Sequence, residues 1–342
     1  MPANVTGLEG IASNITSLDQ CTVELCSLDY ASLRYVPNVG ANAALLGIFV
    51  ILLVAQIVLW FRSRTHSYTF SMICGLILEA VGYAFRIVMR KRMFDDGPFL
   101  IQIICITIAP VFFTAALYLT LSRVIAHYGI YNSRISPKAY TIGFIASDFL
   151  ALVLQSAGGA LAETANDRAT SKAGTNVMVG GLAFQVASLV VFSVLAAEFF
   201  WRVKADRKHI RATNWAYGVP EKPAGDIDGL KTFLYAFTFA TVLILIRSCF
   251  RVAELVNGFR SKLANNEVAF MILEGGMIIL AASILTVFHP GRYFGREMWK
   301  ENGWGGELRN GRSSPELWKM ESAGSSVDGS YENVSRPWPL QQ

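Results

Sequence analysis

Seven strongly apolar blocks divide this chain, and they restrict its fold more than any other feature. They cover about residues 41–61, 68–89, 99–124, 139–162, 177–201, 231–256 and 267–288. A helix needs about 20 apolar residues to cross the hydrocarbon core of a bilayer, and each block reaches that length. Only 16% of the 342 residues are charged, whereas soluble proteins carry about a quarter. The sequence therefore predicts an all-α integral membrane protein with seven transmembrane helices.

The basic residues between the blocks predict the orientation of these helices. Short cytoplasmic loops carry an excess of Lys and Arg, and this excess falls on the cytoplasmic side if the N-terminus lies outside. Two N-glycosylation sequons, at Asn4 and Asn14, support the same placement. We therefore expect an extracellular N-terminal arm at 1–39, a seven-helix transmembrane domain at 40–289, and a C-terminal tail at 290–342. The polar composition of that tail predicts a disordered cytosolic segment.

Charged residues interrupt the sixth block, where they are costly. Arg247, Arg251 and Glu254 are spaced by four and three residues, so all three lie within roughly 60° on one helix face. An arginine near the bilayer centre costs about 2.5–3.5 kcal/mol on insertion scales. The three charges therefore cancel most of the gain from the surrounding apolar residues. This helix needs polar partners or a wet cavity to be stable in a membrane.

Three further blocks carry polar residues that share one helix face, and such faces point toward the bundle rather than toward lipid. From their depth along the helices, we expect these side chains to converge on a polar pocket in the outer half of the bundle. The candidate substrate-binding residues are Glu79, Tyr83, Arg86, Asp148, Gln155, Arg247, Arg251, Glu254 and Glu274. The carboxylates would attract a cationic amine, and the arginines would hold the carboxylates in place or bind a phosphate. Two alternatives stay open, a paired network that only fixes helix packing and a proton relay through the carboxylates.

Cysteine, glycine and proline positions give further expectations. Cys74, Cys105 and Cys249 lie inside apolar blocks, as small buried hydrophobic residues do. In the N-terminal arm, Cys21 and Cys26 could pair if that arm is extracellular. We expect Pro110 to kink the third helix. Two pairs of neighbouring glycines are expected to permit close helix approach: Gly158 with Gly159, and Gly180 with Gly181.

Several function classes lack their motifs in this sequence. The chain has neither a G-x-x-x-x-G-K-[ST] phosphate-binding loop nor a G-x-S-x-G nucleophile turn. Its four histidines lie at block ends or in loops, and no cysteine spacing resembles a zinc site. The basic residues form no continuous patch of the kind that binds nucleic acid. We therefore expect no enzyme activity, no cofactor, no metal and no nucleic-acid partner.

Six segments together resemble the fungal lipid-translocating exporter family, over roughly residues 40–291. They are EAVGYAFR at 79–86, APVFFTAALYLTLSRVI at 109–125, SDFLALVLQSAGG at 147–159, GGLAFQ at 180–185, IRSCFRVAELVNG at 246–258 and HPG at 289–291. The family includes yeast proteins that confer resistance to aminocholesterol and to sphingoid long-chain bases. It usually has an aspartate where this chain places Glu274, a difference that keeps the charge and lengthens the side chain.

The resemblance implies a function that the polar residues alone do not identify. Family members are described as seven-spanning, with an extracellular N-terminus and a location mainly in the plasma membrane. We therefore expect a transporter that moves amphipathic lipids, such as sphingoid long-chain bases or lipophilic amines, toward the outer leaflet and so gives resistance to toxic lipids. An endosomal or vacuolar membrane is the alternative location. Membrane lipids and the lipid substrate are the expected partners, with a homo-oligomer also open. The alternative function is a seven-span lipid sensor or receptor that signals through the cytosolic loops and tail.

Overall fold

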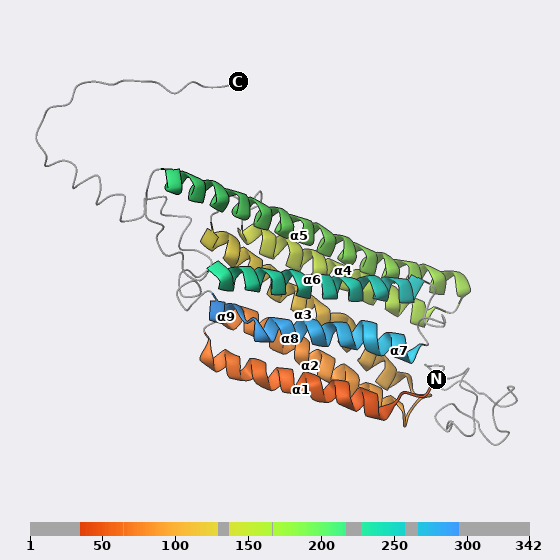
Figure 1. Cartoon of the computed structure of the whole chain (residues 1–342). Helices are drawn as coiled ribbons and strands as arrows, with labels where there is room; N and C mark the ends of the chain where they lie inside the picture. The colour runs from red at the N-terminus through yellow and green to blue at the C-terminus, as the bar shows by residue number, and fades with distance from the viewer. Residues whose placement is uncertain are drawn as a thin grey trace, which may run out of the picture. The chain divides into compact units, whose positions relative to one another are not determined.

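The computed structural model describes residues 35–63, 65–128, 137–165, 167–216, 227–256 and 266–293. These residues are helical, without strands (Figure 1). The elements are α1 (Val39–Arg62), α2 (His66–Met89), α3 (Asp96–Tyr128), α4 (Pro137–Thr164), α5 (Arg168–Ala216), α6 (Ile227–Val256), α7 (Glu267–Phe270), the π-helix η4 (Met271–Gly276), α8 (Met277–Val287) and α9 (Pro290–Tyr293). Seven helices in this part of the chain are long and apolar enough to cross a membrane, the last of them built from α7, η4 and α8. The predicted fold class is confirmed.

Some predictions concern residues outside the described ranges. The two sequons at Asn4 and Asn14, the cysteine pair at Cys21 and Cys26, and nearly all of the C-terminal tail lie there. The orientation of the termini stays a prediction for the same reason.

The helices pack in chain order, and the last one returns to the first. Each of α1 to α5 contacts the next, while α8 contacts both α6 and α1. Helix α3 also contacts α6, which places α3 inside the ring rather than only on its edge. In Figure 1, α1 and α5 lie on opposite sides of the view, with α6 and α8 between them. This arrangement puts the second, sixth and seventh spans around one interior.

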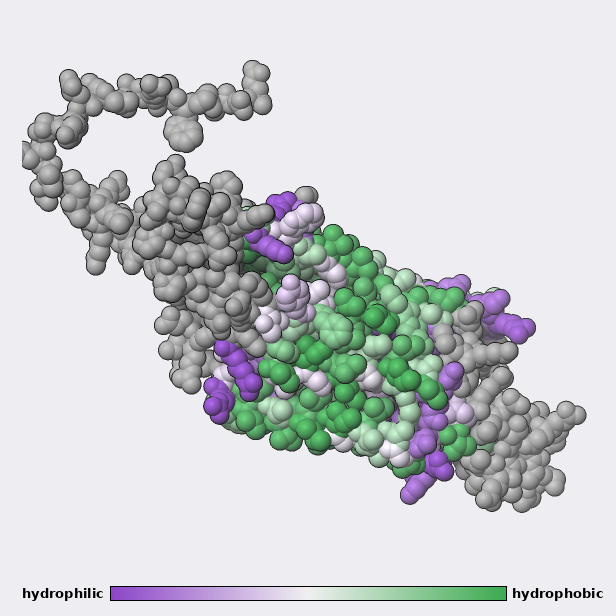
Figure 2. All heavy atoms as spheres, in the orientation of Figure 1, coloured by the Kyte–Doolittle hydropathy of each residue, from purple (hydrophilic) through white to green (hydrophobic). Residues whose placement is uncertain are grey.

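The outer surface of the bundle is apolar, as a lipid-facing surface requires. Helix α1 buries a single narrow stripe, formed by Asn42, Phe49, Gln56 and Leu59. Many other apolar side chains of this helix, such as Ile51, are exposed. Figure 2 shows a broad hydrophobic band with hydrophilic residues gathered toward both ends of the helices. The chain is therefore a multi-pass membrane protein.

Hydrogen bonds fasten α8 to the end of α1 and the start of α2. Gln56 Nε2 donates to Thr286 Oγ1 at 2.9 Å, and the Tyr68 hydroxyl donates to the Leu285 carbonyl at 2.8 Å. Buried His289 places its Nε2 atom 3.4 Å from the hydroxyl of Thr69. Polar side chains thus join the first, second and seventh spans at the end of the bundle away from the candidate site.

Helices α4 and α5 approach each other so closely that backbone meets backbone. A Cβ atom on Gly158 would overlap the Met178 nitrogen and lie 2.7 Å from the Gly174 oxygen. Gly181 is similarly tight, with the Ala151 oxygen 3.0 Å from such an atom. The predicted close approach is confirmed at Gly158 and Gly181, and Gly174 belongs to the same contact although the sequence did not single it out.

The same prediction is wrong at the other two glycines, because each points to a different side of its helix. A Cβ on Gly159 would make only an ordinary contact of 3.8 Å with Met178, and one on Gly180 would meet nothing within 4 Å. The prediction that Cys249 is buried is also wrong, since this thiol is exposed on the outside of α6. Cys105 is buried and Cys74 is half-buried.

Helix α5, which forms the fifth span, is much longer than the apolar block at 177–201. Helix α5 has 49 residues, so it is roughly 70 Å long at 1.5 Å per residue. Its start is fixed by Asp167, whose carboxylate accepts the Thr170 N–H at 2.9 Å. The same backbone N–H lowers the pKa of Asp167, as is common at a helix N-cap. The apolar block thus locates the membrane portion of α5, whereas Asp167 marks where the helix begins.

Candidate functional site

Seven buried polar side chains gather between α2, α6 and η4, and we call them the polar cluster. They are Glu79, Tyr83, Arg86, Arg247, Arg251, Glu254 and Glu274, and each is at most 5% exposed. All seven were predicted as site residues. Three come from α2, three from α6 and one from η4. The cluster therefore depends on contacts between spans that are far apart in the sequence.

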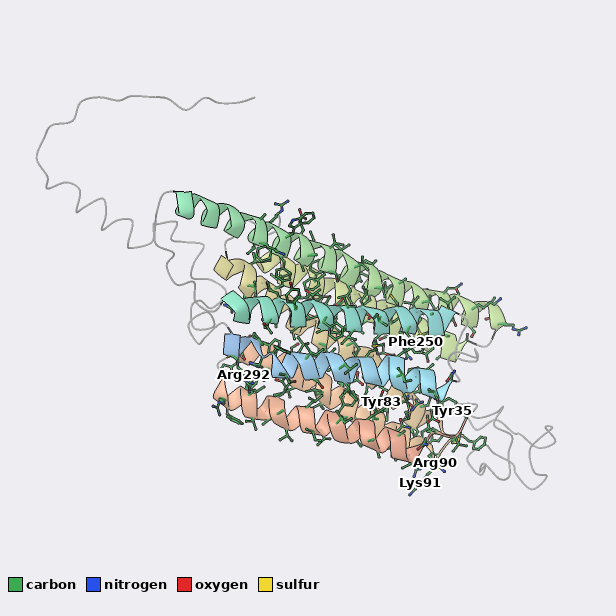
Figure 3. The ribbon with its side chains drawn as sticks, in the orientation of Figure 1. Tyr35, Tyr83, Arg90, Lys91, Phe250 and Arg292 are labelled. Carbon is green, nitrogen blue, oxygen red and sulfur yellow. The ribbon has the colours of Figure 1, made fainter. Side chains whose placement is uncertain are left out.

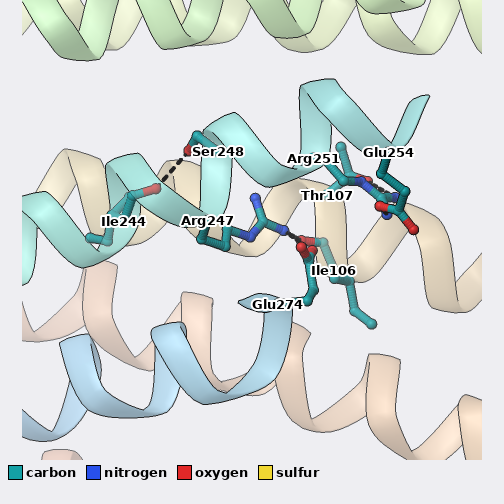
Figure 4. Close-up of polar contacts among 8 residues, drawn as sticks. All are labelled: Ile106, Thr107, Ile244, Arg247, Ser248, Arg251, Glu254 and Glu274. Carbon is teal, nitrogen blue, oxygen red and sulfur yellow. Dashed lines mark hydrogen bonds and ion pairs between the residues drawn. The ribbon is translucent and has the colours of Figure 1, made fainter. Parts of the chain in front are cut away.

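Arg247 is the centre of the α6 side of the cluster (Figure 4). It forms an ion pair with Glu274 of η4, and its Nη2 atom also donates to the Ile106 carbonyl of α3 at 2.8 Å. That carbonyl is available because residue 110 is proline, which has no N–H to donate to the carbonyl four residues earlier. Pro110 thus supplies an acceptor inside the membrane for a side chain of another helix.

Arg251 finds its partners one turn further along α6. Its Nη1 atom donates to Glu254 Oε2 at 2.7 Å, and its Nη2 atom lies 3.3 Å from Thr107 Oγ1 of α3. The Arg251–Glu254 pair is formed within one helix, at a spacing of three residues. Two of the three cluster arginines are therefore neutralised by carboxylates, which explains how α6 tolerates them in a membrane.

Arg86 is held by aromatic rings instead. Its guanidinium carbon lies 3.9 Å from the centre of the Phe270 ring and 5.7 Å from the centre of the Tyr35 ring. It also donates a hydrogen bond to the Tyr35 hydroxyl. Burial raises the pKa of Tyr35 above its usual value of 10.0, so this hydroxyl is neutral at physiological pH. Cation–π contact and one hydrogen bond thus replace an ion pair for this arginine.

Tyr35 belongs to a short segment that leads into α1 and is tied to two other helices. The Asn38 N–H donates to Glu267 Oε1 at 2.7 Å, and Arg90 Nη1 donates to the Pro37 carbonyl at 2.9 Å. In Figure 3, Tyr35 and Arg90 lie together at the end of the bundle, and Tyr83 lies further along it. Sequence reasoning missed Tyr35, because it precedes the first span and follows no helical period.

Several cluster atoms are buried without a hydrogen-bond partner among the described residues. They are Glu79 Oε1, Tyr83 Oη, Arg86 Nε, Arg247 Nε, Arg251 Nε and Glu274 Oε2. Such orphaned polar atoms are rare in protein interiors and need an explanation. The set includes both acceptors and donors, so the polar cluster has capacity to bind a polar ligand beyond what its own side chains use.

Glu274 reaches the cluster through a local change of helix type. It lies in η4, the six-residue π-helical turn Met271–Gly276 that interrupts the seventh span between α7 and α8. A π-turn adds a residue to the helix and rotates the side chains that follow it, and such turns are frequent at functional sites. The turn puts Glu274 against Arg247, and it also places Gly275 opposite Tyr83.

The remaining two predicted site residues lie elsewhere, so the expected convergence of all nine is wrong for them. Asp148 on α4 accepts hydrogen bonds from Thr114 at 2.8 Å and from Tyr118 at 3.0 Å. Gln155 Nε2 donates to Gln185 Oε1 at 3.0 Å. Helix α4 packs mainly against α3 and α5 rather than against α2, α6 or α8. These two side chains therefore fasten neighbouring helices and lie apart from the polar cluster.

The chain is similar to a known protein family and to several yeast proteins. A family model described as "RTA1 like protein" matches residues 72–297. The sphingoid long-chain base transporter RSB1 of Saccharomyces cerevisiae is 34% identical over 280 residues, which cover 76% of this chain and 73% of that protein.

Two further yeast proteins are more distant. Protein RTM1 of Saccharomyces cerevisiae is 27% identical, covering 69% of this chain and 72% of its own length. Protein RTA1 of the same species is 25% identical, covering 75% of this chain and 84% of its own length. No solved structure gives a significant match. The matched family region contains every residue of the polar cluster.

Proposed function

The chain belongs to the RTA1-like protein family, and we propose that it transports sphingoid long-chain bases or related lipophilic amines toward the outer leaflet. The similarity to RSB1, which is named a sphingoid long-chain base transporter, supports this substrate class. We place this activity in the plasma membrane, where outward movement would remove toxic lipids from the cytoplasmic leaflet and give resistance to them. The names of these relatives describe no enzyme activity.

The observation that carries the proposal is the unmet acceptor capacity of the buried carboxyl groups. Glu79 Oε1 and Glu274 Oε2 are buried and accept no hydrogen bond from the described residues. An ammonium group is a compact cation with three N–H donors, so it suits such acceptors. The pairing of Arg247 with Glu274 and of Arg251 with Glu254 keeps the cluster from carrying a large net negative charge. A cationic head group can then bind without becoming trapped.

The two parts of the substrate would lie in different environments. The amine would enter the polar cluster between α2, α6 and η4, whereas the hydrocarbon tail would lie between helices in contact with lipid. The outer faces of these helices are apolar, with exposed side chains such as Ile77, Ile246 and Ile272. Burial of a tail against such surfaces is favourable by about 25 cal/mol per Å² of apolar area. The proposed substrates are therefore amphipathic, with a cationic head group for the polar cluster and a hydrocarbon tail for the apolar helix surfaces.

Efflux of a labelled sphingoid base from cells tests the proposal first. Cells that express the wild-type chain should release more label than vector cells, and Arg251→Ala should lose this efflux at matched surface level. The control is Arg202→Ala, which removes an exposed arginine whose partner, Glu198, lies on the same helix α5. Equal efflux from wild-type and vector cells would contradict the proposed substrate class.

Purified protein in lipid vesicles separates a transporter from the other classes. A transporter moves the labelled base between leaflets, and a sensor binds the base and moves nothing. An enzyme changes the mass of the base, which mass spectrometry detects. We expect movement of the unchanged base. Binding without movement would instead favour the receptor alternative.

A further inference from the structure

The hydroxyl of Tyr83 is the most unusual polar group in the polar cluster. Tyr83 is fully buried, and its Oη atom has no hydrogen-bond partner among the described residues. Buried tyrosine hydroxyls usually find a partner, because an unsatisfied one costs free energy. A phenylalanine at this position would fill nearly the same volume without that cost. The hydroxyl therefore points to a role other than packing.

The surroundings hold the Tyr83 ring in place and set its hydroxyl against bare backbone. The ring stacks on Phe49 of α1, with ring centres 5.4 Å apart. The hydroxyl points at Gly275 in the π-helical turn η4, where a Cβ atom would overlap the Tyr83 oxygen. Only a residue without a side chain fits there. The π-turn thus presents bare backbone to the hydroxyl, and the stacked ring keeps the hydroxyl from turning away.

Charged groups of the cluster surround this hydroxyl on several sides. Glu79 and Arg86 lie on the same helix, and Arg247 and Glu274 interact with Tyr83 electrostatically from α6 and η4. Glu79 precedes Tyr83 by four residues, so the two side chains are neighbours on one face of α2, with about 5–6 Å between their Cβ atoms. An unused carboxylate oxygen and an unused hydroxyl therefore lie within reach of one small head group.

We propose that Tyr83 determines specificity by hydrogen-bonding to a hydroxyl of the head group whose ammonium binds Glu79. This inference rests on the proposed function and names the feature that the site selects, namely an amino alcohol rather than a simple amine. A sphingoid base carries hydroxyl groups beside its amine, and an unbranched alkylamine of equal chain length carries none. Tyr83 distinguishes the two because only the first can satisfy the phenol.

The size of this preference follows from the net worth of one hydrogen bond. Such a bond makes roughly a three- to tenfold difference in binding. The wild-type protein should therefore move a sphingoid base about three to ten times faster than octadecylamine at equal low concentration. Tyr83→Phe should move both at nearly the same rate, because the phenol that distinguishes them is absent.

The experiment uses the purified full chain in lipid vesicles, with both labelled compounds present at once so that one preparation gives the ratio. Tyr118→Phe is the matched control, because it removes another buried tyrosine hydroxyl, one that bonds to Asp148 outside the cluster. This control should keep the wild-type ratio. Gly275→Ala, which would press a methyl group against the Tyr83 hydroxyl, should lower the rate for the sphingoid base more than that for octadecylamine.

The outcomes separate this inference from the proposed function. If the wild-type protein moves neither compound, the proposed function fails and this inference fails with it. If the wild-type protein moves both but Tyr83→Phe keeps the original ratio, or loses both activities in proportion, transport stands and the specificity role of Tyr83 is refuted. The affinities of the detergent-purified variant for the two compounds test the same preference, and this measurement does not depend on vesicle quality.

Discussion

The ion pair between Arg247 and Glu274 allows a prediction whose magnitude can be worked from the structure. Both side chains are buried, at 3% and 1% exposure, and they join α6 to η4. Removing one partner of a buried pair costs about 3–5 kcal/mol, because the other charge is left uncompensated. Removing both partners together costs far less and is often neutral. Replacing each residue with methionine, singly and together, should therefore give strongly non-additive losses of stability.

The two single variants should not be equal. Arg247→Met also removes the donor to the Ile106 carbonyl, which Pro110 leaves without an intrahelical partner. An unsatisfied buried acceptor adds about 1–3 kcal/mol, so Arg247→Met should be less stable than Glu274→Met. Adding Pro110→Ala to Arg247→Met should recover part of that difference, because residue 110 then supplies the missing N–H.

Thermal unfolding of the purified variants in one detergent measures these effects as shifts of the midpoint. The expected order is wild type, then the double variant, then Glu274→Met, then Arg247→Met. Additive losses, with the double variant the least stable of all, would refute the claim that the two charges stabilise each other. Glu274→Gln separates charge from hydrogen bonding, since glutamine still accepts from Arg247, and it should lower sphingoid-base tolerance while leaving surface abundance intact.

Three more variants test other contacts. Gly158→Val should force α4 and α5 apart and abolish folded protein in size-exclusion chromatography, whereas Gly159→Ala should elute as wild type. Asp148→Asn should cost about 1–3 kcal/mol of stability, because Thr114 and Tyr118 both donate to one carboxylate oxygen and a neutral amide oxygen is a weaker acceptor. Transport per folded molecule should not change, and a specific loss of transport would return Asp148 to the site. Tyr35→Phe removes the hydrogen-bond acceptor of Arg86 and should lower the free energy of unfolding by about 1.5–3 kcal/mol. An unchanged unfolding midpoint would mean that the aromatic rings alone hold this arginine.

The sequence predicted the spans because the length of an apolar block is enough to locate them. It predicted much of the polar cluster because helical period places those residues on one face. The spacing of Arg247, Arg251 and Glu254 fixes one face of α6, and charges in a membrane face the interior. The helical period does not reveal which neighbouring helix that face contacts. Asp148 also faces inward, but its neighbour is α3 rather than α6, so it was placed in the wrong group.

Other features have no periodic signal at all. The π-turn around Glu274 depends on how the seventh span packs against its neighbours, and a period of 3.6 residues cannot locate it. Tyr35 lies before the first span, where no pattern constrains it. The free carbonyl of Ile106 could be deduced from Pro110, since a proline always frees the carbonyl four residues earlier. Its donor, Arg247, is 141 residues away in the sequence, and only the packing of α3 against α6 identifies it.

The pairing of Arg247 with Glu274 also has a consequence for biogenesis. The two residues are 27 positions apart, so the ribosome completes the sixth span before it makes the carboxylate that neutralises this arginine. Until then the sixth span carries an unpaired cation and partitions poorly into lipid. We expect the insertion machinery to retain it until the seventh span arrives, and the two to enter the bilayer together as a helical hairpin. Glu274→Met, which removes both the charge and the hydrogen-bond acceptor for Arg247, would then appear first as a failure of the sixth span to insert.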